Sequence, residues 1–226
     1  MSNGVELVVD CRNQLGEGIL WNPEEGLIWW TDIEGQTIWS YDPVADETEQ
    51  FDTPGRITCF APCRSGGLVA AFADGLAYYD VASGMRTDIV AFEPDKPNTR
   101  FNDGRTDRQG RLVAGGVDEE TSAPISTVVR LDPDGTVTTL IEGVSCANGT
   151  CFSPDGRTMY FADTPTGEMV AYDYDPESDR LGARRVIASF EEQPGMPDGS
   201  CVDAEGYAWN AQWEGHRVVR FAPRGA

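Results

Sequence analysis

The strongest constraint on the fold is a turn that recurs along the whole chain. Each copy ends in a glycine followed by a β-rich run, and the copies stand at Gly26, Gly66, Gly110, Gly156 and Gly206. The intervals between these glycines are 40, 44, 46 and 50 residues. Each interval has room for about four short strands, and such a period is typical of the blades of a β-propeller. A β-sandwich is the alternative, but it does not explain the repeated register of the turns.

The runs between the turns predict a meander of short strands in each repeat. In the first repeat we expect strands at residues 19–21, 27–32, 37–42 and 47–51, after an initial strand at residues 5–9 that would normally complete the last blade. The fifth repeat stops after about three strands, whereas a closed ring would need roughly another blade and a half. We therefore expect a single propeller domain over residues 1–226 that is incomplete at its C-terminus, or a ring that closes in a way that the sequence does not show.

The charge balance excludes some classes of partner. The chain has 38 acidic and 17 basic residues and a net charge of −21, and such a surface repels the phosphates of nucleic acid. The acidic surface favours solubility, and adaptation to a salty environment is a second explanation. The sequence has neither a signal-peptide pattern at its start nor an apolar run of about 18 residues. We expect a cytoplasmic protein that binds no membrane, and no protein partner is implied.

The cysteines and the single histidine do not predict a thiolate or imidazole site. Six cysteines occur without a C-x-x-C pair, so we expect buried free thiols in a reducing compartment. His216, the only histidine, is expected at the surface and not as a general base.

Four polar side chains occupy the same register of their repeats. Each stands six residues before the second residue of the turn that follows it. They are Glu17, Asn102, Asn148 and Asp198. Residues that just precede the innermost strand of each propeller blade converge on the mouth of the central channel, so we expect these side chains to meet there. Carboxylate and carboxamide oxygens are ligands for a hard divalent cation. Any one Asn-Gly or Asp-Gly pair is also explained as a simple turn, but four residues in register favour a shared site.

Several motifs together resemble the regucalcin/gluconolactonase family. They follow the family order from about residue 11 to residue 221 and comprise LGEGILW at 15–21, WTDI at 30–33, RFNDG at 100–104, ANG at 147–149 with FSPDG at 152–156, MPDG at 196–199 and RVVRF at 217–221. The resemblance implies a six-bladed propeller whose last blade has no counterpart here. It also implies an enzyme that hydrolyses sugar lactones with a divalent cation in the central channel.

The resemblance assigns roles to individual residues. It implies that Glu17, Asn148 and Asp198 bind the metal, and that Arg100, Asn102 and Glu120 contact the substrate. Asp198, a ligand with a second oxygen, is the expected general base. Ca²⁺, Zn²⁺, Mn²⁺, Mg²⁺ and Fe²⁺ all stay open as the cation.

Three further aspartates are expected to have structural roles. Asp103 is predicted to support the site or form a turn, and Asp32 and Asp163, which end second strands, are predicted to be turn residues.

The expected activity is hydrolysis of an aldonolactone of a pentose or hexose to the sugar acid. A calcium-binding propeller without turnover is one alternative, and a related propeller esterase is another. The sequence does not distinguish among the sugars.

Overall fold

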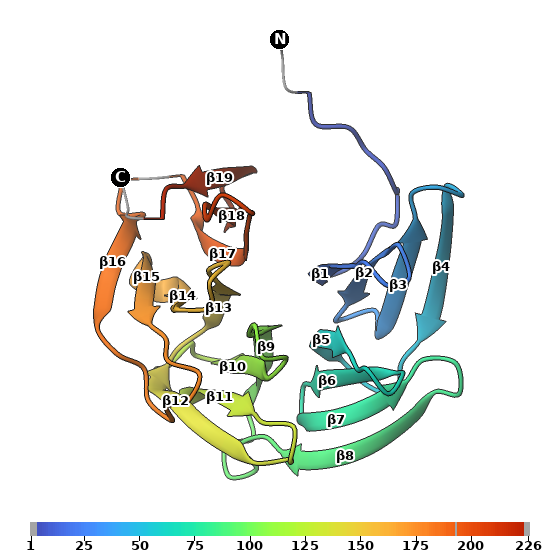
Figure 1. The fold of residues 1–226 in the computed structure, drawn as a ribbon, viewed down its shortest axis with the longest axis horizontal. Helices are drawn as coiled ribbons and strands as arrows, with labels where there is room; N and C mark the ends of the chain where they lie inside the picture. Colours follow the sequence, from blue (N-terminus) through green and yellow to red (C-terminus); the bar gives the residue numbers. More distant parts are fainter. Residues whose placement is uncertain (1–3, 193, 224–226) are drawn as a thin grey trace.

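The computed structural model describes residues 4–192 and 194–223. They form five antiparallel sheets arranged around a common axis, with one short 3₁₀ turn, η1 (Thr164–Thr166) (Figure 1). The predicted propeller is confirmed, and the sandwich is excluded. Among the described residues, no helix is both long and apolar enough to cross a membrane.

Each sheet is a meander whose first strand lies nearest the axis and whose last strand lies outermost (Figure 1). The first sheet contains β1 (Gly16–Asn22), β2 (Leu27–Asp32), β3 (Thr37–Asp42) and β4 (Glu47–Asp52); the second contains β5 (Ile57–Pro62), β6 (Leu68–Phe72), β7 (Gly75–Asp80) and β8 (Met85–Ala91). The third contains β9 (Thr99–Thr106), β10 (Leu112–Asp118), β11 (Ser126–Leu131) and β12 (Val137–Val144); the fourth contains β13 (Ala147–Phe152), β14 (Thr158–Asp163), β15 (Glu168–Asp173) and β16 (Arg184–Ser189). The fifth has three strands, β17 (Met196–Val202), β18 (Ala208–Trp213) and β19 (Arg217–Phe221), as the sequence predicted.

The turn glycines that define the repeat have a conformation that explains their recurrence. All five adopt φ between +68° and +90°, a region in which other L-residues are strained. Each closes the turn between the first and second strand of its sheet, so the sequence period corresponds to one sheet.

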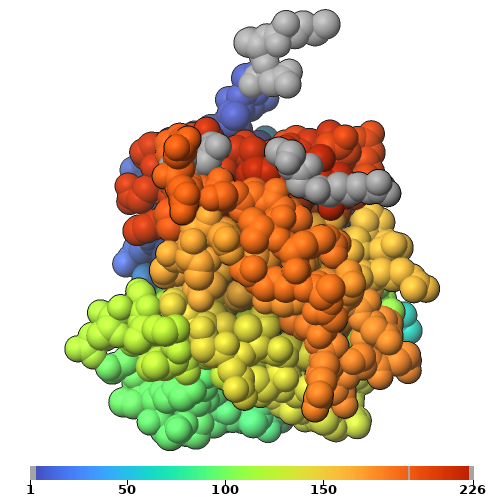
Figure 2. Space-filling model, turned by 90° about the vertical axis from the view of Figure 1, so that its left-hand side faces the viewer, coloured from blue at the N-terminus to red at the C-terminus, as the bar shows by residue number. Residues whose placement is uncertain are grey.

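The hydrophobic core is divided among the interfaces between successive sheets. Four clusters of buried side chains join sheets one to two, two to three, three to four and four to five. At the second interface, Phe92 stacks on Phe101 with 3.7 Å between ring centroids. Figure 2 shows the third, fourth and fifth sheets following one another along the ring, in yellow-green, orange and red. The large exposed apolar residues of the first and fifth sheets include Ile19, Trp21, Trp209, Trp213 and Val218.

The strand predicted at residues 5–9 is wrong. This segment has no strand assignment, and Val5, Leu7 and Val8 are exposed. It leads away from the first sheet toward the N-terminus (Figure 1). A β-rich sequence forms a strand only where another strand offers its free hydrogen-bonding edge, and residues 5–9 pair with none of the described strands.

The thiols are free, as predicted, but they are not uniformly buried. Cys59 and Cys151 are buried, whereas Cys201 is exposed on the fifth sheet. His216 lies exposed in the turn before β19, which confirms the surface position expected for it.

Candidate active site

The four polar residues in register lie on four of the five inner strands, β1, β9, β13 and β17. We expected them just before these strands, and the structure instead places them inside the strands, where each ladder is irregular. The irregularities fall between Glu17 and Leu20, Phe101 and Gly104, Asn148 and Cys151, and Pro197 and Ser200. A β-bulge of this kind adds a residue to one strand and re-aims the adjacent side chains. The repeated bulge is therefore the local cause of the shared register.

Two of the bulges depend on glycine. Gly18 and Gly149, which follow Glu17 and Asn148, have φ values of +63° and +65°. A Cβ at Gly149 would also lie 3.3 Å from the side chain of Ala162. The Glu-Gly and Asn-Gly pairs thus reflect a backbone requirement of the bulge as well as a polar side chain at the site.

Glu17 and Asp198 are partly buried carboxylates of like charge that influence one another. Burial, followed by the negative charges of Asp198 and Asp103, raises the pKa of Glu17 from 4.5 to about 8, and Arg100 opposes the rise. Burial and the charge of Asp103 likewise raise the pKa of Asp198 from 3.8 to about 6. The carboxylates of the first and fifth sheets are therefore close enough for the charge of Asp198 to raise the pKa of Glu17.

Asp103 is the carboxylate behind this pair. Its Oδ2 accepts a hydrogen bond of 2.8 Å from the backbone N–H of Thr150, which joins β9 to β13. Burial raises the pKa of Asp103, and Arg105 opposes that effect. This supporting position agrees with the sequence prediction for Asp103.

The donor set suits a hard divalent cation. Glu17 and Asp198 repel one another while they are ionised, and a cation between them would remove that penalty. No group of three carboxylate, thiolate or imidazole side chains in the described part of the chain is arranged to hold a metal, so a site at this place would also use a donor of another kind, such as a carboxamide oxygen. Asn148 is buried on β13, the inner strand that packs against β17.

Arg100 and Asn102 are joined to the same group. Arg100 Nη1 donates to Asn102 Oδ1 at 2.7 Å, and Asn102 Nδ2 donates to Ala147 O at 2.9 Å and to Asn148 Oδ1 at 3.3 Å. Arg100 Nε donates to Glu119 Oε1 at 2.8 Å. Hydrogen bonds to protein acceptors thus engage Nε and Nη1 of Arg100.

Glu120, the third predicted substrate residue, is exposed and accepts a hydrogen bond from Asn98 Nδ2. The contact with Arg100 comes instead from the adjacent Glu119, which is also bound by Arg56. Glu119 and Arg56 could not be identified from the sequence, because two consecutive glutamates give no indication of which one turns toward Arg100.

Asp32 and Asp163 fix the segments that lead into two of the inner strands. Asp32 accepts backbone hydrogen bonds from Gln14 and Leu15, both at 2.9 Å, and Asp163 Oδ1 accepts one from Cys146 at 2.9 Å. Both aspartates end second strands, as predicted, and hold the chain just before β1 and β13.

Arg105 connects three inner strands across the axis of the ring. Its Nη1 donates to the carbonyl oxygen of Ile19 at 3.0 Å on β1, and its Nη2 donates to that of Ser200 at 3.4 Å on β17. The third sheet is thereby tied to both the first and the fifth.

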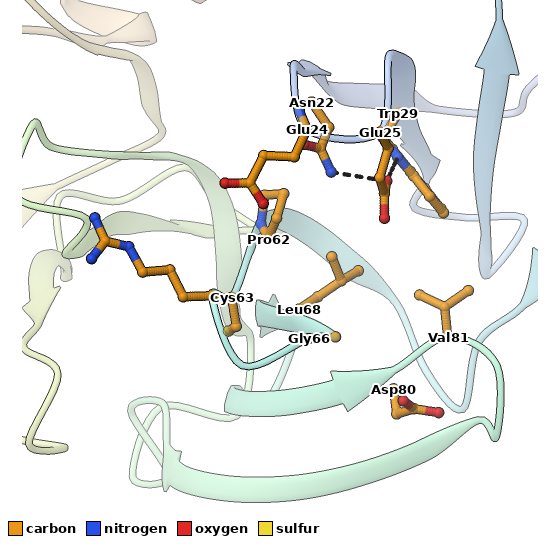
Figure 3. A pocket seen from close by; sticks show the side chains of 12 residues that line it. Asn22, Glu24, Glu25, Trp29, Pro62, Cys63, Gly66, Leu68, Asp80 and Val81 are labelled. Atoms are coloured by element: carbon orange, nitrogen blue, oxygen red, sulfur yellow. Dashed lines mark hydrogen bonds between the residues drawn. The ribbon is translucent and has the colours of Figure 1, made fainter.

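A pocket at the opposite end of β1 from Glu17 belongs to a different part of the molecule (Figure 3). It lies between the first and second sheets, and none of the predicted site residues lines it. Its carboxylate Glu25 already accepts hydrogen bonds from Asn22 Nδ2 at 2.8 Å and Trp29 Nε1 at 3.0 Å.

Comparison with known proteins gives consistent matches. Residues 15–226 match the model of the SMP-30/Gluconolactonase/LRE-like region. The chain is 40% identical over 223 residues to the L-arabinolactonase of Azospirillum brasilense, covering 97% of this chain and 74% of that protein. It is 37% identical over 219 residues to the pentonolactonase of Haloferax volcanii, covering 96% and 73%. The crystal structure of a calcium-binding protein, regucalcin, from Agrobacterium tumefaciens superposes with a TM-score of 0.90 at 30% identity, over 97% of this chain and 74% of that one.

Proposed function

Because the chain belongs to the SMP-30/gluconolactonase/LRE-like family, we propose that it hydrolyses a sugar lactone to the corresponding sugar acid with one divalent cation. The observation that carries this proposal is that the partly buried carboxylates of Glu17 and Asp198 and the buried carboxamide of Asn148 occupy equivalent positions on inner strands of the ring. The relatives named L-arabinolactonase and pentonolactonase support an aldonolactone as the substrate.

Glu17, Asn148 and Asp198 would hold the cation. A cation bound there supplies Lewis-acid polarisation of the lactone carbonyl and favours ionisation of a nearby water. In the reaction, the water oxygen adds to the carbonyl carbon, and the bond from that carbon to the ring oxygen breaks. The ring oxygen leaves as a hydroxyl group and the carbonyl carbon becomes the carboxylic acid.

Asp198 is the proposed general base. Its carboxylate has two oxygens, so one can bind the cation while the other takes a proton from the attacking water. This role needs the ionised form, which the charge of a bound cation favours over the protonated form that burial favours.

Arg100 and Asn102 are the proposed substrate contacts. Glu119 and Asn102 engage Nε and Nη1 of Arg100, and Nη2 makes no hydrogen bond to a protein acceptor among the described residues. That nitrogen can donate to a sugar hydroxyl or to the oxyanion that develops on the carbonyl. Glu120 is retained as a third substrate contact because it stands at the same end of the third sheet.

The test is acid release measured at constant pH on a panel of pentono- and hexonolactones. The protein is loaded in turn with Ca²⁺, Mg²⁺, Mn²⁺, Zn²⁺ or Fe²⁺, and a chelator is added in a parallel series. Turnover that the chelator abolishes and that a cation restores would support the proposal. Absence of turnover in folded, metal-loaded protein would contradict it.

A second candidate is a calcium-binding propeller without turnover, which the description of the Agrobacterium protein as calcium-binding favours. Tight Ca²⁺ binding without acid release from any lactone would support this candidate. Turnover of aryl esters in place of lactones would instead indicate a propeller esterase.

A further inference from the structure

Thr164 forms hydrogen bonds to the surroundings of two of the three proposed metal ligands. Its hydroxyl accepts a hydrogen bond of 2.8 Å from Asn148 Nδ2 and donates one of 2.8 Å to the carbonyl oxygen of Pro197, the residue before Asp198. Thr164 begins η1, between the second and third strands of the fourth sheet, and its side chain joins that sheet to the fifth. Both Asn148 and Thr164 are buried.

The directions of these hydrogen bonds determine how the Asn148 carboxamide is oriented. A carbonyl oxygen only accepts, so the single hydroxyl proton of Thr164 must point to Pro197 O. The hydroxyl oxygen can then only accept from Asn148, which places the NH₂ group of Asn148 toward Thr164. The other end of the carboxamide, Oδ1, therefore faces the channel, where a cation needs an oxygen and is repelled by an NH₂ group.

The hydrogen bond at the other end of the Asn148 carboxamide, at Oδ1, gives the same orientation independently of Thr164. Arg100 only donates, so the atom of Asn102 that faces it must be Oδ1. The NH₂ group of Asn102 consequently points to Ala147 O and to Asn148, whose facing atom must be an acceptor oxygen. This second contact is the longer one, at 3.3 Å, so the hydroxyl of Thr164 is the stronger constraint.

The backbone around Thr164 is anchored to the start of β13. The N–H of Thr164 donates to Cys146 O at 3.0 Å, and Asp163 Oδ1 accepts the N–H of Cys146 at 2.9 Å. The hydroxyl therefore has a fixed position relative to Asn148, two residues beyond Cys146, and does not depend on a freely moving loop.

We propose that Thr164 is a positioning residue for the metal site: its hydroxyl holds Asn148 with Oδ1 toward the cation and holds the backbone that leads into Asp198. This inference rests on the metal site of the proposed function, but not on the identity of the substrate. It predicts that loss of the hydroxyl allows the Asn148 carboxamide to rotate and present its NH₂ group to the cation.

The test is a metal titration of the chelator-treated protein by calorimetry, with Ca²⁺ and Mn²⁺ as probes. Thr164→Val keeps the shape of the side chain and removes the hydroxyl, and we expect the dissociation constant to rise about 10- to 100-fold, as is usual when a partner of a metal ligand is lost. Thr164→Ser keeps the hydroxyl and should bind within about threefold of the wild type. Thr164→Ala carries the same prediction as Thr164→Val and replaces it should the valine variant fail to fold.

Thr166→Val is the matched control. Thr166 lies in the same 3₁₀ turn, and its hydroxyl donates to the carbonyl oxygen of Asp163 at 2.7 Å without contacting a proposed ligand. Metal affinity should be unchanged in this variant. An equal loss in Thr166→Val and Thr164→Val would overturn the proposal, because the effect would then come from a general weakening of the turn.

A double-mutant cycle with Asn148→Asp separates orientation from a purely structural role. The two oxygens of a carboxylate are equivalent, so an aspartate needs no orienting hydroxyl. Adding Thr164→Val to Asn148→Asp should therefore change the metal affinity by less than about threefold. An undiminished loss in that background would overturn the proposal.

Parallel lactone assays keep this inference distinct from the proposed function. A protein whose metal affinity falls in Thr164→Val but which hydrolyses no lactone would support the positioning role and contradict the proposed reaction. A protein that hydrolyses lactones and whose metal affinity is unaffected by Thr164→Val would support the proposed reaction and contradict the positioning role. A wild-type protein that binds neither Ca²⁺ nor Mn²⁺ would contradict the positioning role.

Discussion

Arg100 Nε donates a hydrogen bond of 2.8 Å to Glu119 Oε1. The same carboxylate receives two hydrogen bonds from Arg56, of 2.8 and 2.9 Å, and the hydrogen bond from Arg56 is the main reason that the pKa of Glu119 is lowered. Arg56 belongs to the segment before β5, so the second sheet helps to hold a guanidinium of the third. The orientation of Arg100 toward Asn102 therefore depends on Glu119, which has no part in the proposed reaction itself.

Replacing Glu119 should impair catalysis through Arg100. Glu119→Gln removes the charge and leaves one acceptor oxygen for two guanidinium groups, so we expect Arg100 to become less well fixed. The predicted result is a fall in kcat/KM of about tenfold, carried mainly by KM, because Arg100 is proposed to bind substrate. Steady-state kinetics on the best lactone, with the cation at saturation, measures it.

Glu34→Gln is the control for that substitution. Glu34 contacts Arg56 at 3.1 Å but is not a partner of Arg100. Its replacement should leave the kinetics within about twofold of the wild type, since exposed ion pairs contribute little. Equal defects in both variants would argue that the Arg56 contact, and not Arg100, determines the effect.

The metal-free protein should lose stability as the pH rises. Burial and neighbouring negative charges raise the folded-state pKa of Glu17 to about 8 and that of Asp198 to about 6. At these two carboxyl groups, the folded chain therefore binds more protons than the unfolded chain between pH 3.8 and about 8. The stabilisation from these protons is present at low pH and is lost as the pH rises through the folded-state pKa values.

This pH effect is measured from melting temperatures in chelator at several pH values. Glu17→Gln cannot ionise, so its melting temperature should exceed that of the wild type by a margin that grows toward pH 8. A margin that stays constant with pH would mean that Glu17 does not titrate in this window.

The arrangement of the sheets was predictable from the sequence because local signals repeat. Turn glycines such as Gly110 and Gly156 are required by the backbone at each repeat. Within each sheet, neighbouring strands are also consecutive in the sequence and are joined by short turns. Residues 5–9 show the limit of this reasoning, because their β-rich composition says nothing about whether a partner strand is within reach. The number of blades was predictable as well, because the family resemblance implied a six-bladed propeller without its last blade, and the structure contains five sheets.

The site was predictable only in part. The shared register located Glu17, Asn102, Asn148 and Asp198 because equivalent positions of propeller strands meet at one place. The residues that orient them, Glu119 and Thr164, lie on connections, and each also contacts a segment of a neighbouring sheet: Arg56 before β5 for Glu119, and Pro197 on β17 for Thr164. Such contacts depend on tertiary packing, which has no period in the sequence.

A buried ion pair in the turn between β9 and β10 of the third sheet, which Tyr174 connects to the fourth sheet, should contribute strongly to stability. Arg111 contacts Asp107 at 2.6 Å, both side chains are nearly inaccessible, and Tyr174 Oη donates to Asp107 Oδ2 at 2.8 Å. Asp107→Ala would leave the Arg111 charge buried without this partner, which costs about 3–5 kcal/mol. Urea denaturation followed by circular dichroism measures the loss.

Asp179→Ala provides the comparison for that prediction. Asp179 pairs with Arg130 at 2.8 Å, but its side chain is 77% exposed. Its removal should change the free energy of unfolding by less than about 1 kcal/mol, because water screens the pair. Similar losses in the two variants would contradict the assignment of the stability to burial.

The acidic surface predicts stabilisation by salt. With a net charge of −21, repulsion among carboxylates opposes folding, and ions at molar concentration screen it. We expect the melting temperature to rise steadily from dilute buffer to molar NaCl. Chelator is kept present so that traces of divalent cation do not contribute, and a flat response would make the charge an ordinary feature of solubility.

Asp198→Asn tests the proposed general base. The variant keeps the shape and one oxygen donor but lacks the negative charge and the proton acceptor. Loss of a positioned base usually costs about 10²–10⁴ in rate, so we expect kcat to fall by that factor at saturating cation. The cation concentration for half-maximal activity should rise as well, because a charged ligand has been replaced by a neutral one. The measurements are kcat as a function of cation concentration and the melting temperature of each protein.

Asn102→Ala is the companion variant, because it separates substrate binding from metal binding. Thr164 still orients Asn148 in this variant through a bond of 2.8 Å, so calorimetry should find the metal affinity retained within a few-fold while KM rises. If Asp198 served only to form a turn, asparagine would replace it without loss, since both residues tolerate such turns. Full activity in Asp198→Asn would therefore remove Asp198 from the mechanism. Loss of metal binding in Asn102→Ala would show that Asn102 belongs among the metal ligands.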